Sequence, residues 1–190
     1  MQLENYRDAD GRRVRLTNDE RDRLLEEYDD GTDERLAMEL MSRCGLRSAE
    51  VLDVGPEDVV RGDDTDQWFL RVPEGKGDKE RMTPMPATLA GYCRAQGSSP
   101  ILDVTTRTLR RWVGRAAQRR STAENDSRWE YVRPHDLRRT WGHLMLESGV
   151  QASVLMEFGG WSDYQTFQRH YLGKHSEATK AREAEKVGWL

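Results

Sequence analysis

His135 and Arg138 are the first residues whose types and spacing indicate chemistry. They stand three residues apart at the start of a predicted helix, so their side chains share one face. Pro134 suits the first turn of that helix, where its missing N–H removes no hydrogen bond. An imidazole that exchanges protons near neutral pH would then lie beside a permanent planar cation, a pairing that suits a developing phosphate oxyanion. The alternative is an ordinary solvated pair in a first helical turn.

Two further cations are placed by tight turns. Arg47 follows a predicted left-handed helix end at Gly45 and precedes Ser48, which can cap the next short helix. Its alternative role is structural, as a partner of Glu50 or of a helix C-terminal carbonyl. Lys76 lies between two glycines at the predicted tip of a β-hairpin, where backbone can approach a partner closely. The alternative for Lys76 is a solvated turn.

One predicted helix carries a stripe of arginines with hardly an acidic residue among them. Such a stripe favours contact with a DNA backbone, whereas a plain solvated face normally mixes charges of both signs. Arg139, next to Arg138, is a further candidate for DNA contact. The stripe consists of Arg107, Arg110, Arg111, Arg115 and Arg119.

Composition narrows the class of protein. The 190-residue chain has a formal net charge of −4, which weighs against an indiscriminate nucleic-acid binder but allows local basic surfaces. No apolar run could span a bilayer and no signal-peptide pattern is present, so we expect a cytoplasmic protein without a membrane partner. Cys44 and Cys93 lack metal-ligand spacing, and we expect no metal ion and no cofactor. Arginine favoured over lysine among many acidic residues fits a salt-adapted cytoplasm or GC-rich coding.

Helical periodicity dominates the segments that carry these side chains. Thr17 and Glu20 form a capping box that begins the first helix. Leu137, Trp141, Leu144 and Met145 form the apolar stripe of the helix that begins at Pro134. We expect helices over residues 17–28, 32–45, 87–95, 106–120, 134–148 and 162–171, with short helices after Ser48 and before Gly159.

The remaining segments predict a small sheet and loops. Strands are expected over residues 59–60, 67–72 and 80–85, the last at a sheet edge because it contains Pro84. Residues 1–16 have no periodicity and are expected to be a polar leader, and residues 121–129 a polar loop. The expected fold class is mainly α with a small antiparallel β-sheet, in one compact domain.

Five motifs, taken in chain order, resemble the catalytic domain of the tyrosine recombinase (phage integrase) family. The resemblance covers residues 17–173, most of the chain, and implies the fold of the DNA breaking-rejoining enzymes. The motifs are an arginine corner at residues 44–50, Gly-Lys-Gly-Asp-Lys-Glu-Arg at 75–81, His-Asp-Leu-Arg-Arg-Thr at 135–140, Gly-Trp-Ser-Asp at 160–163 and Arg-His-Tyr at 169–171.

The resemblance also implies a role for each cation. Arg47 and Arg138 would clamp the scissile phosphate, and Lys76 would protonate the leaving 5′-oxygen. His135 would assist proton transfer and phosphate binding. These roles fit the residues themselves, because two arginines in a dry site can stabilise negative charge on phosphate oxygens without a metal.

Tyr171 would be the nucleophile that forms a 3′-phosphotyrosine link to DNA. Trp161 stands where most members of the family have His and some have Trp, and its indole can donate one hydrogen bond but cannot carry a proton. In the family the tyrosine typically follows that position by nine residues, whereas here it follows by ten. The turn before the last helix must absorb the extra residue, which rotates a helix by about 100°.

The resemblance implies the organisation and partners as well. Residues 17–175 would form the catalytic domain, and residues 176–190 a helical tail that contacts a neighbouring protomer. The N-terminal helical core-binding domain usual in the family has no counterpart in the 16 residues before the first predicted helix. The expected partner is double-stranded DNA with specific recombination sites, on which the protein would assemble as a tetramer.

Three other functions remain open at this stage. A type IB topoisomerase-like enzyme would relax supercoils through the same intermediate. A non-catalytic DNA-binding protein would regulate a mobile element and would not need intact arginines, lysine and tyrosine. A structural or partner-binding α domain would make the motifs coincidental. The integrase interpretation accounts for the most residues.

Overall fold

The computed structural model describes residues 1–5, 12–73, 80–171, 181 and 183–189, and most of its regular structure is helical. This confirms the mainly α fold class with a small antiparallel sheet. No helix within these ranges is long and apolar enough to cross a membrane. The helices are α1 (Asn18–Leu25), α2 (Asp33–Arg43), α3 (Ala87–Ala95), α4 (Thr106–Glu124), α5 (Pro134–Glu147), α6 (Ala152–Gly159) and α7 (Tyr164–Tyr171), with short 3-10 turns η1 (Glu50–Leu52), η2 (Pro56–Asp58) and η3 (Ser127–Tyr131).

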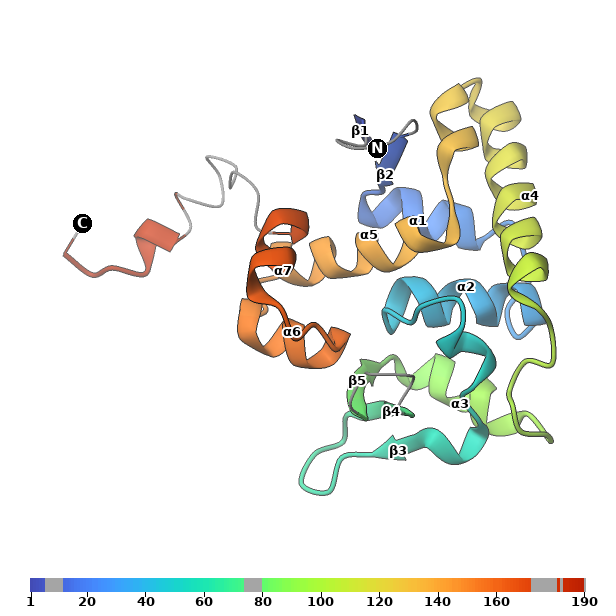
Figure 1. Ribbon diagram of the computed structural model, residues 1–190, viewed down its shortest axis with the longest axis horizontal. Helices are drawn as coiled ribbons and strands as arrows, with labels where there is room; N and C mark the ends of the chain where they lie inside the picture. The colour runs from blue at the N-terminus through green and yellow to red at the C-terminus, as the bar shows by residue number, and fades with distance from the viewer. Residues whose placement is uncertain (6–11, 74–79, 172–180, 182, 190) are drawn as a thin grey trace.

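Helices α2 and α5 pack against each other across the centre of the molecule (Figure 1). The predicted capping box begins α1, since the Thr17 hydroxyl accepts from the Glu20 N–H and the Glu20 carboxylate accepts from the Thr17 N–H. Gly45 ends α2 with φ +70°, as its sequence predicts. A Cβ at Gly45 would lie 2.2 Å from the Trp141 ring, so glycine also permits the close contact of this corner with α5.

The small sheet is antiparallel in the order β3-β4-β5, formed by Val59–Arg61, Trp68–Val72 and Arg81–Met85. Leu70 pairs with Val59 on one side and with Thr83 on the other. Strand β5, which contains Pro84, is at the edge as predicted, because Pro84 has no N–H for a further ladder. Residues 74–79, including the predicted hairpin tip at Lys76, lie outside the described residues.

The prediction of a polar leader over residues 1–16 is wrong for the part that the structure describes. Gln2–Asn5 (β1) pairs antiparallel with Arg12–Arg15 (β2), and Val14 and Leu16 are buried in the main core. The expected loop at 121–129 is also wrong. Helix α4 continues to Glu124, where Asn125 ends it at φ +51°, and η3 buries Trp129.

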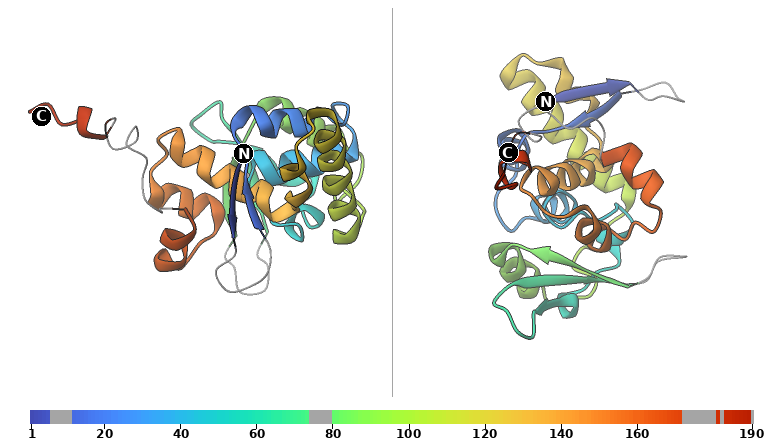
Figure 2. Two further views of the ribbon diagram at one scale, coloured as in Figure 1. Left: turned by 90° about the horizontal axis from the view of Figure 1, so that it is seen from above. Right: turned by 90° about the vertical axis from the view of Figure 1, so that its left-hand side faces the viewer.

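A second, smaller apolar cluster lies where α5, α6 and α7 meet at one end of the molecule (Figure 1). The described strands of both β-hairpins are directed toward one side of the molecule, the face presented in Figure 1 (Figure 2). Cys44 and Cys93 are both buried free thiols, as expected for Cys44. The buried members of the smaller cluster are Trp141, Leu155, Phe167 and Tyr171.

Candidate active site

A pocket of about 290 Å³ lies between the ends of α2, α5 and α7. It brings together residues that are separated by up to 158 positions in the chain, since Arg13 and Tyr171 both line it. Of the side chains predicted to be catalytic, five line this pocket and Lys76 lies outside the described residues. The lining residues are Arg13, Arg47, His135, Arg138, Arg139, Trp161 and Tyr171.

Arg138 forms the floor of the site and is only 1% exposed. Its guanidinium donates to the carbonyl of Gly45 and, at 2.6 Å, to the carbonyl of Gly159. It also lies over the Trp161 ring, 4.7 Å from the centroid. Burial, with the charge of Arg47, lowers the pKa of Arg138 to about 10. The group therefore stays cationic at neutral pH and is held in one orientation.

Arg47 is oriented by Glu50 from the same corner. The Arg47 backbone N–H and guanidinium donate to the two carboxylate oxygens, at 2.6 and 2.8 Å. Arg81 donates to both oxygens as well, at 2.9 and 2.8 Å. Burial alone would raise the pKa of Glu50, but hydrogen bonds and charge from Arg81, together with the Arg47 N–H, lower it to about 2. One carboxylate thus organises two arginines and lies 3.6 Å from a third, Arg138.

His135 stands in the first turn of α5, one residue after Pro134. Its side chain is exposed while Arg138, one turn further, is buried, so the pair lines the pocket from the mouth to the floor. The turn is fixed by Asp136, whose carboxylate accepts from the backbone N–H of Arg133 at 3.0 Å. The position suits a group that exchanges protons with a substrate entering from solvent.

Tyr171 is the last residue of α7 and is 9% exposed. Its ring packs against Trp161, Phe167 and His143, with centroid distances of 4.8, 5.1 and 5.3 Å. Burial raises the pKa of the Tyr171 hydroxyl above its usual value, against the opposing charges of three nearby arginines. The phenol therefore stays protonated at neutral pH in the absence of a ligand.

Trp161 is the aromatic platform of the site. Its ring lies 6.0 Å from that of Trp141 and 5.2 Å from that of Phe167. Gly160 ends α6 at φ +65°, and the backbone N–H of Trp161 then donates to the Met156 carbonyl at 3.0 Å. A short turn leads to α7, and Tyr171 lines the pocket despite the ten-residue spacing.

The residues predicted to contact DNA fall into two groups. The α4 arginines 107, 110, 111, 115 and 119 are all exposed along one helix. Arg119 already donates to the Glu27 carboxylate and carbonyl, each at 2.7 Å, and lies over the Tyr28 ring. Arg139 is buried instead, pairs with Asp136 at 2.8 Å and lines the pocket.

Sequence reasoning missed two arginines that build the site. Arg13 lines the pocket from β2, and Arg81 is buried between Glu50 and the carbonyl of Phe158. The Arg-x-x-Glu spacing at 47–50 did signal the Arg47–Glu50 pair as a structural alternative. Arg81 is the last residue of the motif at 75–81, but nothing in that motif predicts its role, because its partners are 31 and 77 residues away. Among the described residues no group of three or more His, Cys, Asp or Glu side chains could hold a metal ion.

Known proteins resemble this chain in sequence and in fold. The family model described as "Phage integrase family" matches residues 14–177. Tyrosine recombinase XerA of Thermococcus kodakarensis is 29% identical over 169 residues, which cover 81% of this chain and 56% of that protein. The chain spans about half the length of the curated relatives it matches.

Solved structures show the same fold at low sequence identity. The crystal structure of XerA recombinase superposes with a TM-score of 0.66 at 19% identity, covering 92% of this chain and 65% of that one. The structure of the Tn1549 transposon integrase in complex with transposon right end DNA gives a TM-score of 0.63 at 16% identity, covering 92% and 66%.

Proposed function

Because the chain belongs to the phage integrase family, we propose that it carries the catalytic machinery of a site-specific DNA recombinase. Residues 17–175 are the catalytic domain in this proposal, and the protein cleaves and rejoins DNA through a 3′-phosphotyrosine with Tyr171 as nucleophile. The observation that carries the proposal is the shared pocket, which five candidate catalytic side chains line.

The arginines supply the electrostatic part of the chemistry. When a nucleophile attacks a phosphodiester, negative charge builds on the non-bridging oxygens. Arg47 is held by Glu50, and Arg138 by two backbone carbonyls and the nearby charge of Glu50, so both are oriented before a substrate arrives. Charge-assisted hydrogen bonds from such fixed donors are stronger than neutral ones and require little reorganisation. The scissile phosphate is expected to lie between these two guanidiniums.

Tyr171 supplies the covalent part. Its oxygen attacks phosphorus, the bond from phosphorus to the 5′-oxygen breaks, and the leaving oxygen takes up a proton. The resemblance assigns that proton to Lys76, and His135 at the pocket mouth assists transfer of the phenol proton. One phosphoester bond replaces another, so a 5′-hydroxyl can reverse the step without ATP. The Trp161 ring packs against the Arg138 guanidinium and the Tyr171 ring, and its indole N–H can donate one hydrogen bond.

The proposed partner is double-stranded DNA with specific recombination sites. The exposed arginines of α4 are assigned to its backbone, and assembly into a tetramer on DNA is proposed with residues 176–190 contacting a neighbouring protomer. The Tn1549 integrase, which shares the fold, was solved in complex with transposon DNA. Much of the segment at 176–190 lies outside the described residues.

Covalent capture of DNA tests the proposal. Wild-type protein is incubated with end-labelled, nicked duplex fragments that trap the intermediate, and adducts are separated on a denaturing gel. We expect an adduct on a peptide containing Tyr171, none with Tyr171→Phe, and suppression of about 100-fold or more with Arg138→Ala or Arg47→Ala. Each variant is checked for an unchanged circular dichroism spectrum. Capture by Tyr171→Phe would refute the assignment of the nucleophile.

Product analysis separates recombination from simple relaxation of supercoils. Plasmids that contain two copies of a DNA site at which the covalent intermediate was trapped are incubated with the protein. The products are then analysed for junctions between the two sites. Junctions support a recombinase. Relaxed circles without junctions or site preference would instead identify a topoisomerase-like activity of the same pocket.

A further inference from the structure

Strand β2 carries an arginine into the pocket that none of the recognised motifs includes. Side chains alternate along a strand, so Arg13 and Arg15 point to one side and Arg12 and Val14 to the other. Arg12 lies over the Tyr131 ring, 4.8 Å from the centroid, and Val14 is buried. Arg13 lines the pocket together with Arg47 and four other candidate catalytic residues.

The position of Arg13 is fixed because β2 is docked on the same helix that carries His135 and Arg138. Two backbone N–H groups, one in β2 and one directly after it, donate to side chains of α5. The Val14 N–H donates to the Asp136 carboxylate and the Leu16 N–H to the Thr140 hydroxyl, each at 3.1 Å.

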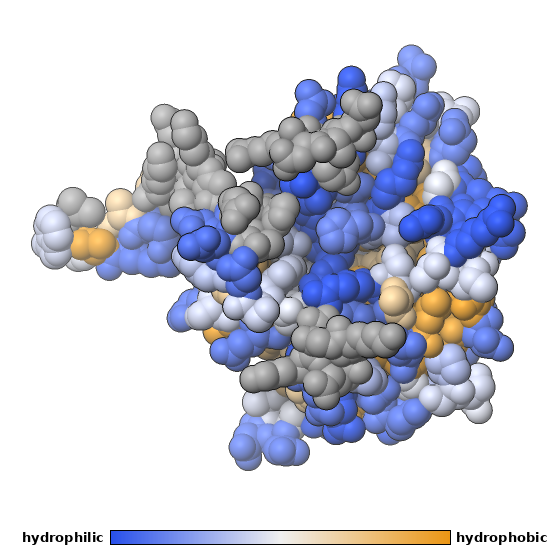
Figure 3. Space-filling model, in the orientation of Figure 1, coloured by the Kyte–Doolittle hydropathy of each residue, from blue (hydrophilic) through white to orange (hydrophobic). Residues whose placement is uncertain are grey.

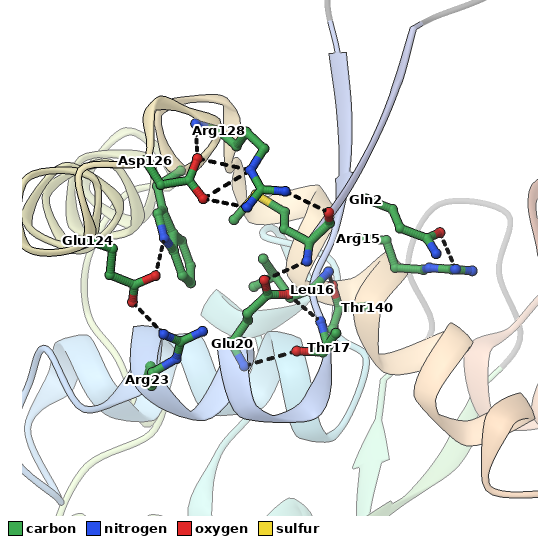
Figure 4. A network of polar contacts seen from close by, with 12 residues as sticks. Gln2, Arg15, Leu16, Thr17, Glu20, Arg23, Glu124, Asp126, Arg128 and Thr140 are labelled. Carbon is green, nitrogen blue, oxygen red and sulfur yellow. Dashed lines mark hydrogen bonds and ion pairs between the residues drawn. The ribbon is translucent and has the colours of Figure 1, made fainter.

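Side chains strengthen this attachment. The Arg15 guanidinium lies 3.3 Å from Nδ1 of His143 and also donates to Gln2 of β1. Asp136, Thr140 and His143 lie four and three residues apart, on one face of α5. Figure 4 shows Arg15 beside Gln2 and Leu16 beside Thr140, and the N-terminal ammonium group of Met1, directly before β1, donates to Glu20 of α1. The strand that presents Arg13 is therefore part of the rigid body of the site.

The charge balance of the pocket leaves room for an anion. Glu50 offsets Arg47 and Arg81, and Asp136 offsets Arg139. No carboxylate belongs to the lining of the pocket, as far as the described residues extend, whereas four guanidiniums and one imidazole do. A phosphodiester has two non-bridging oxygens that share one negative charge and offer several lone pairs, enough to accept hydrogen bonds from more than two arginines.

We propose that Arg13 is a third phosphate-binding arginine, which donates to a non-bridging oxygen of the phosphodiester held by Arg47 and Arg138. The inference rests on the proposed function, because it takes the pocket to be the site of a DNA phosphate. It adds a residue that comes from the N-terminal hairpin. The hairpin thereby becomes part of the phosphate-binding machinery as well as of the core.

Titration with inorganic phosphate tests Arg13 without knowledge of the DNA sequence. Trp161 lines the pocket, so its indole N–H resonance in ¹H–¹⁵N NMR spectra, identified with Trp161→Phe, reports occupancy. We expect Arg13→Ala to weaken phosphate binding about tenfold, the value of one charge-assisted hydrogen bond. Arg12→Ala, the matched control, removes the same charge from the opposite side of β2 and is expected to change the affinity less than twofold. Arg47→Ala is the positive control.

The outcomes separate this inference from the proposed function. If Arg47→Ala weakens phosphate binding and Arg13→Ala does not, the role of Arg13 is refuted and the proposed function stands. If phosphate leaves the Trp161 resonance of the wild type unchanged, both fail. If Arg13→Ala displaces the amide resonances of Val14 and Leu16, the substitution has disturbed β2, and Arg13→Lys is measured instead. A phosphate affinity of Arg13→Lys within threefold of wild type supports phosphate binding by residue 13. A phosphate affinity of Arg13→Lys as weak as that of Arg13→Ala overturns the role of Arg13.

Discussion

At the scale of single residues, the site depends on a carboxylate that is not expected to touch the substrate. Arginines gathered in one pocket repel each other and lose hydration on burial. Glu50 offsets this cost for Arg47 and Arg81 through hydrogen bonds of 2.6 to 2.9 Å. The same bonds fix the orientation of Arg47, so stability and preorganisation have one source.

Glu50→Gln is expected to destabilise the fold in a pH-dependent way. The pKa of Glu50 is about 2 in the folded protein, below its ordinary value of 4.5, so its contribution is present above about pH 4.5 and is lost as pH falls toward 2. We expect the variant to lose roughly 2–3 kcal/mol of unfolding free energy at pH 7 and much less near pH 2.5. Urea unfolding at both pH values measures the difference.

The matched control is Glu26→Gln, which alters an exposed carboxylate at the end of α1. It is expected to change the unfolding free energy by less than about 0.5 kcal/mol at either pH. An equal loss for Glu50→Gln at pH 7 and pH 2.5 would contradict the assigned role, since the effect would then be independent of charge.

At the scale of elements, local signals determine how well the sequence predicts the fold. Thr17 acts through its hydroxyl and Gly45 and Pro84 through their own backbone, all within a few residues, and the cap, corner and edge strand that they predict are all present. The β1–β2 hairpin could not be predicted in this way. Val14 and Leu16 are single apolar residues among arginines, and their strand is held by α5, more than 120 residues away.

The site shows the same division between local and distant information. Two pairs of residues, Arg47 with Glu50 and His135 with Arg138, each lie within one short motif. Their proximity could be predicted from spacing alone. Nothing in the periodicity places Tyr171 near them. Its place beside them was expected from the family resemblance, and in the structure Tyr171 lines the same pocket as Arg47, His135 and Arg138. Arg13 and Arg81 enter the site only through tertiary contacts. No local pattern marks Arg13, and the motif that ends at Arg81 does not predict its partners.

Helix α5 approaches the tyrosine so closely that one position requires glycine. A Cβ at Gly142 would lie 2.5 Å from Cε1 of Tyr171, nearer than real Cβ contacts. We expect Gly142→Ala to displace the phenol and to lower covalent DNA capture about 100-fold, because a shift of roughly 1 Å misaligns a nucleophile. Its unfolding free energy is expected to fall by about 1–2 kcal/mol, since the overpacking outweighs the better helix propensity of alanine.

Gly114→Ala is the matched control for that substitution. Gly114 also lies inside a helix, α4, but its added Cβ would meet nothing within 4 Å. We expect unchanged capture and a gain of roughly 0.5–1 kcal/mol in stability, measured by urea unfolding. Equal loss of capture in both alanine variants would mean that helix flexibility matters, and not the contact with Tyr171.

At the scale of the whole molecule, an acidic protein must present a local basic surface to bind DNA. The net charge is −4, yet hydrophilic side chains cover the middle of the face toward which both hairpins are directed (Figure 3). All five arginines of the stripe on α4 are exposed, and one of them, Arg119, is already paired with Glu27. Binding is therefore expected to depend on where the cations lie and to weaken steeply with salt.

Removing two cations from α4 tests whether this helix contacts the DNA backbone. For Arg107→Ala/Arg110→Ala we expect binding to duplex DNA to weaken about tenfold or more near 0.1 M salt. The slope of log affinity against log salt concentration should become shallower by about 0.9 for each phosphate that the variant no longer neutralises. Fluorescence anisotropy at several salt concentrations measures both quantities.

The control variant is Arg61→Ala/Arg94→Ala, which removes the same net charge from a different surface. Both arginines lie over the Trp68 ring, and Arg61 pairs with Trp68 at the end of the sheet opposite the β4–β5 connection. Because the two double variants have equal net charge, long-range repulsion of DNA is the same in both. A smaller slope in the α4 variant alone assigns the phosphate contacts to that helix, whereas equal slopes in the two variants would show that the stripe is merely a solvated face.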